Sequence, residues 1–177
     1  MIEILLSQWD LIELAIDGSK LMRLMKLSVR GEYALRALLV LGRLRTGAVV
    51  SIQAMAAEQH LPRKFLEQIL NDLRRAGIVE SRRGAAGGYR LSRSANDISL
   101  AEVIRRVDGA LAPVSCVSER FYEKCTCPDE TRCPLRSIMK EVRDSVAVQM
   151  ERTSVADLVA RERLLQTSPM PSLDYEI

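Results

Sequence analysis

Aromatic residues are scarce in this sequence, since Phe, Trp and Tyr together make up 4% of its 177 residues. Any buried core must therefore be aliphatic, and Leu, Ala and Met are residues that favour helices. The chain has one histidine, and no pair of carboxylates can be placed in a common pocket, so hydrolytic and acid–base catalysis are not expected. No apolar run approaches the roughly 20 residues that span a membrane, and we expect no membrane partner.

Cysteine is also rare, with four residues in the whole chain. That density is too low for a secreted disulfide scaffold, and the N-terminus lacks the basic start and cleavage site of a signal peptide. We therefore expect a cytoplasmic protein, in a reducing compartment where clustered cysteines are more often metal ligands or redox groups than disulfides. All four lie in one polar, turn-rich stretch: Cys116, Cys125, Cys127 and Cys133.

Three helices are predicted in the first half of the chain. Residues 28–44 carry a broad apolar face at helical spacing. Ser51 is a good N-cap for a short second helix. Pro62 suits the first turn of a third helix, which Gly77 ends. Two short helices joined by a few residues are typical of a helix-turn-helix.

The residues after the third helix predict a β-hairpin, with strands at 78–81 and 88–91 around a loop rich in Gly and Arg. A hairpin directly after a recognition helix is a wing. A further helix is expected over 98–108, and apolar residues then recur three or four apart along a long helix: Leu135, Ile138, Met139, Val142, Val146 and Met150. The predicted fold class is mainly α, a winged helix-turn-helix with a small β-hairpin wing and a long C-terminal dimerisation helix.

These patterns divide the chain into five segments. The first, residues 1–24, is interpreted as an N-terminal extension from a misassigned start, because Met25 opens a much cleaner pattern. A dimer seam would bury the apolar stripe of the long helix; the alternative is that this helix packs back on its own domain. The other segments are a winged-helix DNA-binding domain (25–111), a cysteine sensing loop (112–134), a dimerisation helix recapped at Thr153 or Ser154 (135–165) and a disordered tail (166–177).

Positive charge is concentrated between residues 62 and 93, which carry eight basic and three acidic side chains, although the net charge of the whole chain is +3. A charge run on one helix is usually a solvated face, but its coincidence with a helix pair and a wing favours duplex DNA. The side chains of the third helix expected to reach base edges are Arg63, Lys64, Glu67, Gln68 and Asn71. The DNA-binding candidates on the wing are Arg82, Arg83, Gly87, Gly88 and Tyr89.

Several segments from Met25 onward form a set that can be compared with known families: MKLSVRGEYALRALL, FLEQILNDLRRAGIVES, RRGAAGGYRLSR, ISLAEVIRRVDG, and CPL before a long helix ending in SVADLV. Together they resemble the IscR/NsrR-type winged-helix transcription regulators, the Rrf-two family, many of which carry an iron–sulfur cluster. The resemblance implies a homodimer that reads a palindromic operator in double-stranded DNA. It also implies that the protein senses iron–sulfur status, nitric oxide or redox state.

The same resemblance implies ligands for a 2Fe-2S or 4Fe-4S cluster. Similar members use three loop cysteines, the last two commonly five residues apart, and some add an acidic residue from the partner's N-terminal helix. A histidine ligand of other members corresponds to Arg136, which has no lone pair to donate. The one histidine of this chain, His60, is expected to be structural or DNA-facing. The fourth ligand stays open between Cys125 and Glu32, so the metal candidates are Cys116, Cys125, Cys127, Cys133 and Glu32.

Three other interpretations are weighed against a cluster-bearing regulator. The first is a cluster-free regulator of the same fold, whose cysteines bind zinc or act as a thiol switch. The second is a thiol oxidoreductase, which is disfavoured because the chain has no CxxC motif and no thioredoxin-like βαβ pattern. The third is a winged helix that binds another protein, for which Arg82 and Arg83 would be dispensable in DNA binding.

Overall fold

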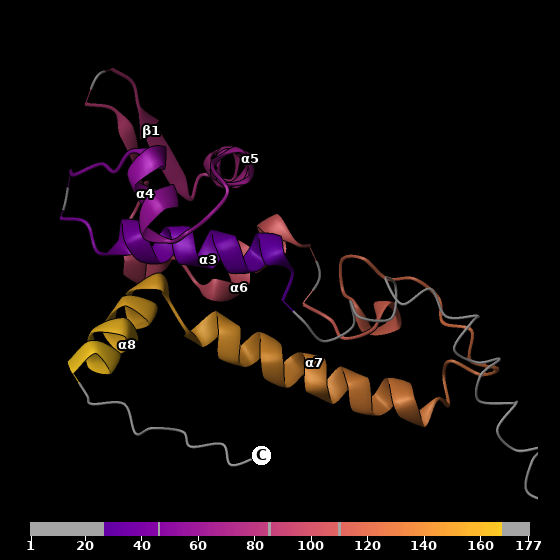
Figure 1. Cartoon of the computed structure of the whole chain (residues 1–177). Coiled ribbons are helices and arrows are strands. Elements are labelled where there is room, and N and C mark those ends of the chain that lie inside the picture. Colours follow the sequence, from indigo (N-terminus) through magenta and orange to yellow (C-terminus); the bar gives the residue numbers. More distant parts are fainter. Residues whose placement is uncertain (1–26, 46, 85, 110, 168–177) are drawn as a thin grey trace, which may run out of the picture.

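The computed structural model describes residues 27–167 except 46, 85 and 110, so the predicted extension at 1–24 and residues 168–177 of the predicted tail lie outside the described residues. Figure 1 shows a head formed by α3 to α6 and the hairpin, with α7 extending from a distant end back to the underside of the head, where α8 begins. The predicted fold class is confirmed. In chain order the elements are α3 (Val29–Gly42), α4 (Ile52–Glu58), α5 (Arg63–Arg75), β1 (Val79–Arg82), β2 (Gly88–Leu91), the 3₁₀ turn η1 (Ala95–Asp97), α6 (Leu100–Val107), the 3₁₀ turn η2 (Ser115–Val117), α7 (Pro134–Arg152) and α8 (Val155–Thr167).

The core of the head is aliphatic, as the shortage of aromatic residues predicts. Ser28 caps α3 by accepting a hydrogen bond from the Gly31 N–H at 3.0 Å. The buried faces of α3, α4 and α5 meet the start of β1 and the entry to α6, and each fully buried Leu or Ile contributes roughly 1.5–3 kcal/mol. The largest fully buried side chains include Leu38, Met55, Leu66, Ile69, Leu70, Leu73, Ile78 and Ile98.

The turn between α4 and α5 is built on His60, whose backbone has a positive φ of 52°. Its N–H donates to the Ala57 carbonyl at 3.3 Å, and the Leu61 N–H donates to the Ala56 carbonyl at 2.9 Å. This pair of bonds is the Schellman pattern that ends helices. Since Leu61 is buried, the turn also directs the chain into α5. The backbone of His60 has a structural role in this turn, while its side chain is exposed, so a DNA-facing role stays a prediction.

We expect His60→Val to lower the free energy of unfolding by about 1–2 kcal/mol, because β-branched residues tolerate a left-handed backbone poorly. His60→Gly relieves the same strain and is expected to lie within about 1 kcal/mol of the wild type, since glycine also gains freedom in the unfolded chain. Urea unfolding followed by circular dichroism measures both values. Equal losses in the two variants would show that backbone strain at this turn is not the cause.

The wing is a two-stranded antiparallel hairpin in which Arg82 lies opposite Gly88, and its first strand lies one residue later than predicted. Tyr89 exchanges two further backbone hydrogen bonds with Val50, at 2.8 and 3.0 Å, which tie the hairpin to the head. A Cβ at Gly88 would lie 2.6 Å from the Val50 carbonyl carbon, and one at Gly87 would overlap the Arg82 carbonyl oxygen. Close backbone approach therefore accounts for both glycines within the fold.

Helix α7 begins at Pro134 with Cys133 as its N-cap, and none of its residues is buried. Half of its apolar stripe is exposed within the described chain: Leu135, Ile138 and Val146 are 58%, 53% and 44% exposed, whereas Met139, Val142 and Met150 are half-buried. A helix that is not buried against its own domain has apolar surface to offer a partner. Across the described ranges, no helix is long and apolar enough to cross a membrane.

Helix α8 starts after a break that the sequence marks with a new cap. The Ser154 hydroxyl accepts from the Asp157 N–H at 3.1 Å, and the Ser154 N–H donates to the Asp157 carboxylate at 2.8 Å. The hydrogen bonds to that carboxylate hold the pKa of Asp157 below its usual value. Val155 and Val159 are buried against α3 at Gly42, where a Cβ would lie 2.9 Å from each valine. Residues 135–165 are thus two helices, of which the second packs on the head.

Candidate functional site

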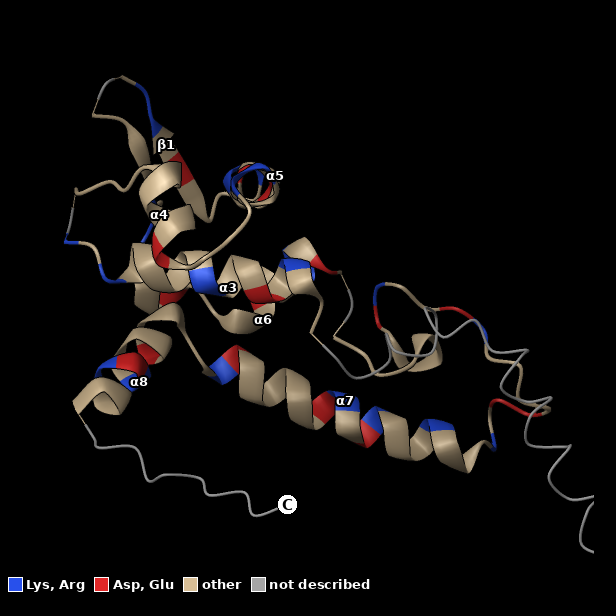
Figure 2. Ribbon diagram, in the orientation of Figure 1, with Lys and Arg blue, Asp and Glu red and all other residues tan. Residues whose placement is uncertain are grey.

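The outer face of α5 presents the side chains that the sequence assigns to base reading. Four of them, Arg63, Lys64, Glu67 and Gln68, are exposed, and Asn71 is half-buried. The opposite face packs into the core because apolar residues recur three and four apart along the helix. Figure 2 shows basic residues on both α5 and the hairpin loop. Helix α5 therefore has one face for the head and one for a ligand.

The tertiary structure divides the basic residues of this region into two groups. Arg90 pairs with Glu80 across the hairpin, and Arg93 pairs with Glu102 at 2.5 Å. Arg75 lies 3.6 Å from Asp72, whose carboxylate also binds an arginine of α3. The remaining cations form no ion pair among the described residues, and are Arg63, Lys64, Arg74, Arg82 and Arg83.

Arg74 is a residue that the sequence interpretation did not single out. It is exposed and lies three positions after Asn71, so it extends the same face of α5. Helical spacing was the signal that could have identified it. Tyr89, in contrast, is half-buried and packs against the core, while its backbone bonds to Val50.

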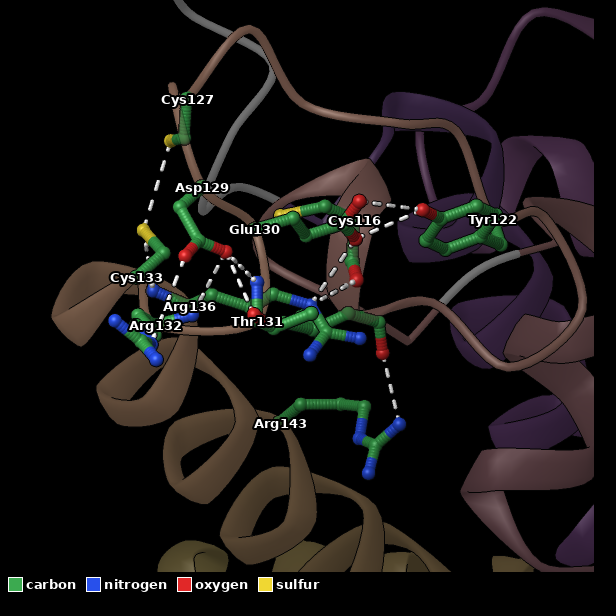
Figure 3. A network of polar contacts seen from close by, with 11 residues as sticks. Cys116, Tyr122, Cys127, Asp129, Glu130, Thr131, Arg132, Cys133, Arg136 and Arg143 are labelled. Atoms are coloured by element: carbon green, nitrogen blue, oxygen red, sulfur yellow. Dashed lines mark hydrogen bonds and ion pairs between the residues drawn. The ribbon is translucent and has the colours of Figure 1, made fainter.

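The cysteine loop is closed by a short turn immediately before α7. Asp129 Oδ1 accepts hydrogen bonds from the Thr131 N–H at 2.9 Å and the Arg132 N–H at 3.3 Å, and from the Thr131 hydroxyl at 2.6 Å. These hydrogen bonds hold the pKa of Asp129 below its usual value. The turn brings Cys127 Sγ to 3.5 Å from Cys133 Sγ, as Figure 3 shows.

The ionisation of the thiols differs across this loop. Cys133 Sγ caps α7 by accepting from the Arg136 N–H at 3.4 Å, and this hydrogen bond, with the one that Cys133 shares with Cys127, lowers the pKa of Cys133. Hydrogen bonds to Cys125 and Cys133 raise the pKa of Cys127 to about 12. Burial and the neighbouring Cys125 raise the pKa of Cys116. Of these three thiols, Cys133 is the one whose surroundings favour the thiolate that binds metals.

The structure gathers all four cysteines into one region. Cys127 Sγ lies 3.5 Å from Cys133 Sγ, and Cys125 is near enough to Cys116 and Cys127 to raise the pKa of both. Their thiolates are the soft ligands that suit iron–sulfur clusters, so the donor set fits such a group. Among the residues that the structure describes, no three His, Cys, Asp or Glu side chains are arranged around one point as a bound metal ion would require.

Glu32, the acidic metal candidate, has an ion-pair partner within its own helix. It is exposed in the first turn of α3, where its carboxylate pairs with Arg36 at 3.3 Å. Its place at a helix N-terminus is favourable for a carboxylate without any metal. Among the described residues of one chain, Glu32 forms no group of three metal-binding side chains with the cysteines.

Comparison with known proteins decides the family. Residues 27–161 match the family model Rrf2, described as an iron-dependent transcriptional regulator. The chain belongs to the Rrf2 family. This Rrf2 protein is 40% identical over 133 residues to an rrf2-like protein of Rhodobacter capsulatus, a match that covers 73% of this chain and 89% of that protein. It is 28% identical over 153 residues to the regulator IscR of Vibrio atlanticus, covering 86% of each chain.

Solved structures agree with this placement of the Rrf2 protein. The structure of CymR, the global cysteine regulator of B. subtilis, matches with a TM-score of 0.65 at 28% identity, covering 77% of this chain and 98% of that one. The T. potens IscR structure also gives 0.65, at 26% identity over 82% and 94% of the two chains. The protein is therefore a helix-turn-helix transcriptional regulator of a DNA-binding family, and the prediction that it is not an enzyme is confirmed.

Proposed function

We propose that this Rrf2 regulator is a homodimer that binds a palindromic operator and holds a 2Fe-2S or 4Fe-4S cluster in its cysteine loop. The observation that carries the proposal is the gathering of all four cysteines beside the N-terminus of α7, with Cys127 and Cys133 3.5 Å apart. The description of the family as iron-dependent supports it. Operator affinity would then follow the state of the cluster.

The chain's own residues have separate roles in this proposal. Cys133, Cys127 and Cys116 hold the cluster, and the fourth ligand is either Cys125 or Glu32 of the partner subunit. When bound, the cluster supplies a centre that oxidants and nitric oxide attack. A carboxylate ligand is hard and weakly held by such a soft centre, which suits a sensor. Because Cys133 also caps α7, its ligation state acts on the first turn of that helix.

The DNA-binding half of the proposal rests on the unpaired cations of the head. Helix α5 enters the major groove, where Gln68 and Asn71 can pair with adenine and Arg63 with guanine. Glu67 can accept from a cytosine amine. Arg82 and Arg83 reach phosphates or the adjacent minor groove from the wing. Two such heads bind half-sites about 34–36 Å apart, a spacing that the α7 pair sets in the homodimer.

A second candidate function is a thiol switch on the same fold without a cluster. The 3.5 Å separation of Cys127 Sγ and Cys133 Sγ favours it, since a small movement would allow a disulfide between them. Both cysteines are half-exposed and so open to an oxidant. Zinc bound by the same thiolates is the related alternative.

Protein purified without oxygen is expected to be coloured and to contain iron and sulfide, with the signal abolished in a variant whose four cysteines are changed to Ser. Cys133→Ser alone is expected to remove most of it. Iron analysis, sulfide analysis and visible absorption measure this, and His60→Gly is the control, expected to keep its full iron content. Stoichiometric zinc would favour the metal alternative. A colourless, iron-free protein that binds its operator equally well without its cysteines would refute the proposal.

The fourth ligand is tested by two single variants. Cys125→Ser and Glu32→Gln each remove one candidate while leaving the three other proposed ligands, Cys116, Cys127 and Cys133, in place. The variant that lacks the true ligand is expected to lose iron to a chelator faster than the wild type, because one corner of the cluster is then held by solvent. Equal rates for both variants and the wild type would exclude both residues.

A further inference from the structure

Two arginines of α7 hold the buried turn that carries Cys116. Arg136 Nε donates to the Cys116 carbonyl at 3.2 Å, and Arg143 Nη1 donates to the Val117 carbonyl at 2.8 Å. The arginines are seven residues apart and therefore lie on one side of the helix, while the carbonyls belong to consecutive residues of η2. Cys116 and Val117 are 8% and 5% exposed. Figure 3 shows both arginines beside this turn.

Acidic residues orient both guanidinium groups. Glu130, whose side chain is 16% exposed, lies 3.2 Å from Arg136 Nε and accepts from the Tyr122 hydroxyl at 2.8 Å. That hydrogen bond raises the pKa of Tyr122. Arg143 is 13% exposed and pairs with Asp144 at 2.5 Å and Glu119 at 3.4 Å. Charged donors make stronger hydrogen bonds to carbonyls than neutral donors do, and Arg143 is shielded from water whereas the Arg136 side chain is 39% exposed.

Arg136 connects two of the proposed ligands. Its main-chain N–H contacts Cys133 Sγ at 3.4 Å, and its side chain contacts the Cys116 carbonyl. Both arginines lie roughly a quarter-turn of helix away from the apolar stripe through Val146, given 100° per residue. The turn can therefore dock on α7 while the stripe stays open, as the exposure of Ile138 and Val146 shows.

We propose that Arg136 and Arg143 are positioning residues that clamp the Cys116 turn onto α7, and so set where Cys116 stands relative to Cys133 before any cluster binds. The arginine at position 136, which cannot itself bind a metal, would instead position the ligand Cys116. The consequence for the cluster rests on the proposed function, but the clamp itself is a property of the cluster-free protein. Preorganised ligands bind without the cost of ordering the loop.

The test measures the alkylation rate of each cysteine in chelator-treated, reduced protein with iodoacetamide, by peptide mass spectrometry. Arg136→Met and Arg143→Met are each expected to raise the rate at Cys116 about ten-fold, since a hydrogen bond to a charged group is worth about a factor of ten or more. Cys127 is half-exposed already and serves as the internal reference. Its alkylation rate is expected to change less than about two-fold, which is the effect of losing one weak surface contact. Arg132→Met is the matched control, because Arg132 is 89% exposed in the same loop.

Unchanged alkylation of Cys116 in both arginine variants would overturn the clamp, and so would an equal rise at all four cysteines. If an arginine variant melts at a lower temperature, Glu130→Gln tests the clamp instead. This change removes the ion pair that holds the Arg136 side chain and leaves both arginines in place. It is expected to raise the Cys116 rate selectively, and no selective rise would count against the clamp. A wild-type protein that contains no iron would refute the proposed cluster. The alkylation result would still stand, because it is measured on iron-free protein. In iron-loaded protein, both arginine variants are expected to lose iron to a chelator about ten-fold faster.

Discussion

The double variant Arg82→Ala/Arg83→Ala is expected to bind operator DNA and random-sequence DNA more weakly by similar factors. Both side chains are exposed on the hairpin and unpaired among the described residues, so their charges are available to phosphates. Each phosphate contact contributes about 0.9 to the slope of log affinity against log salt. Two lost contacts reduce the magnitude of this slope by about 1.8. The ratio of wild-type to variant affinity therefore grows by about 60-fold when the salt falls from ~1 M to ~0.1 M.

Fluorescence anisotropy over a salt titration measures this effect, with an operator selected by the wild-type protein from a random library. The matched control is Arg161→Ala/Arg163→Ala, which removes the same charge from exposed positions of α8, at the other end of the molecule from the hairpin (Figure 1). A control that weakens binding as much as the wing variant would show that net charge is responsible. Unchanged binding by the wing variant would favour a protein-binding winged helix.

A charge placed in the apolar stripe of α7 is expected to convert the proposed dimer to monomers. Ile138→Asp/Val146→Asp puts two carboxylates per chain into the seam, and symmetry doubles them. Desolvating each charge costs several kcal/mol. We therefore expect the dimer to lose at least about 4 kcal/mol of association free energy, which is about a thousand-fold in affinity. Operator binding falls with it, because a monomer covers one half-site.

Sedimentation velocity measures the change in association state. Val146→Asp and Val148→Asp make a matched pair, since the two valines are 44% and 45% exposed in the chain and lie on opposite faces of α7. The Val146 variant is expected to dissociate and the Val148 variant to remain a dimer. Equal behaviour of the two would place the dimer contact elsewhere, and a monomeric wild type would refute the seam.

The helices, the turn and the wing were predicted from the sequence because each depends on local physical signals. Ser51 accepts from the Ala54 N–H at 3.2 Å as the N-cap of α4, in line with its residue type. The hairpin follows α5 at the predicted place, and its first strand differs by one residue. The apolar period of α7 is present, but periodicity cannot tell whether such a face packs on its own domain or on a partner.

The DNA-binding and metal candidates were harder to refine from sequence, because charge and thiol chemistry depend on neighbours. The basic run between residues 62 and 93 did not show that Arg90 and Arg93 are paired within the protein. Arg74 was missed although it shares a helical face with Asn71. Whether these candidates contact DNA or metal stays a prediction, which the variants described above test.

The sequence by itself determined the order of the helices, their caps, the place of the wing, and the segment that contains every cysteine. It also determined that position 136 carries a residue unable to ligate metal. Only the tertiary structure decided which cations remain unpaired, that α8 packs on the head, and that Arg136 binds the Cys116 carbonyl. The physical reason is sequence separation. Caps and helical faces join residues three or four apart, whereas the contacts of Arg136 with Cys116 and of Arg30 with Asp72 join residues 20 and 42 apart, so they depend on the path of the whole chain.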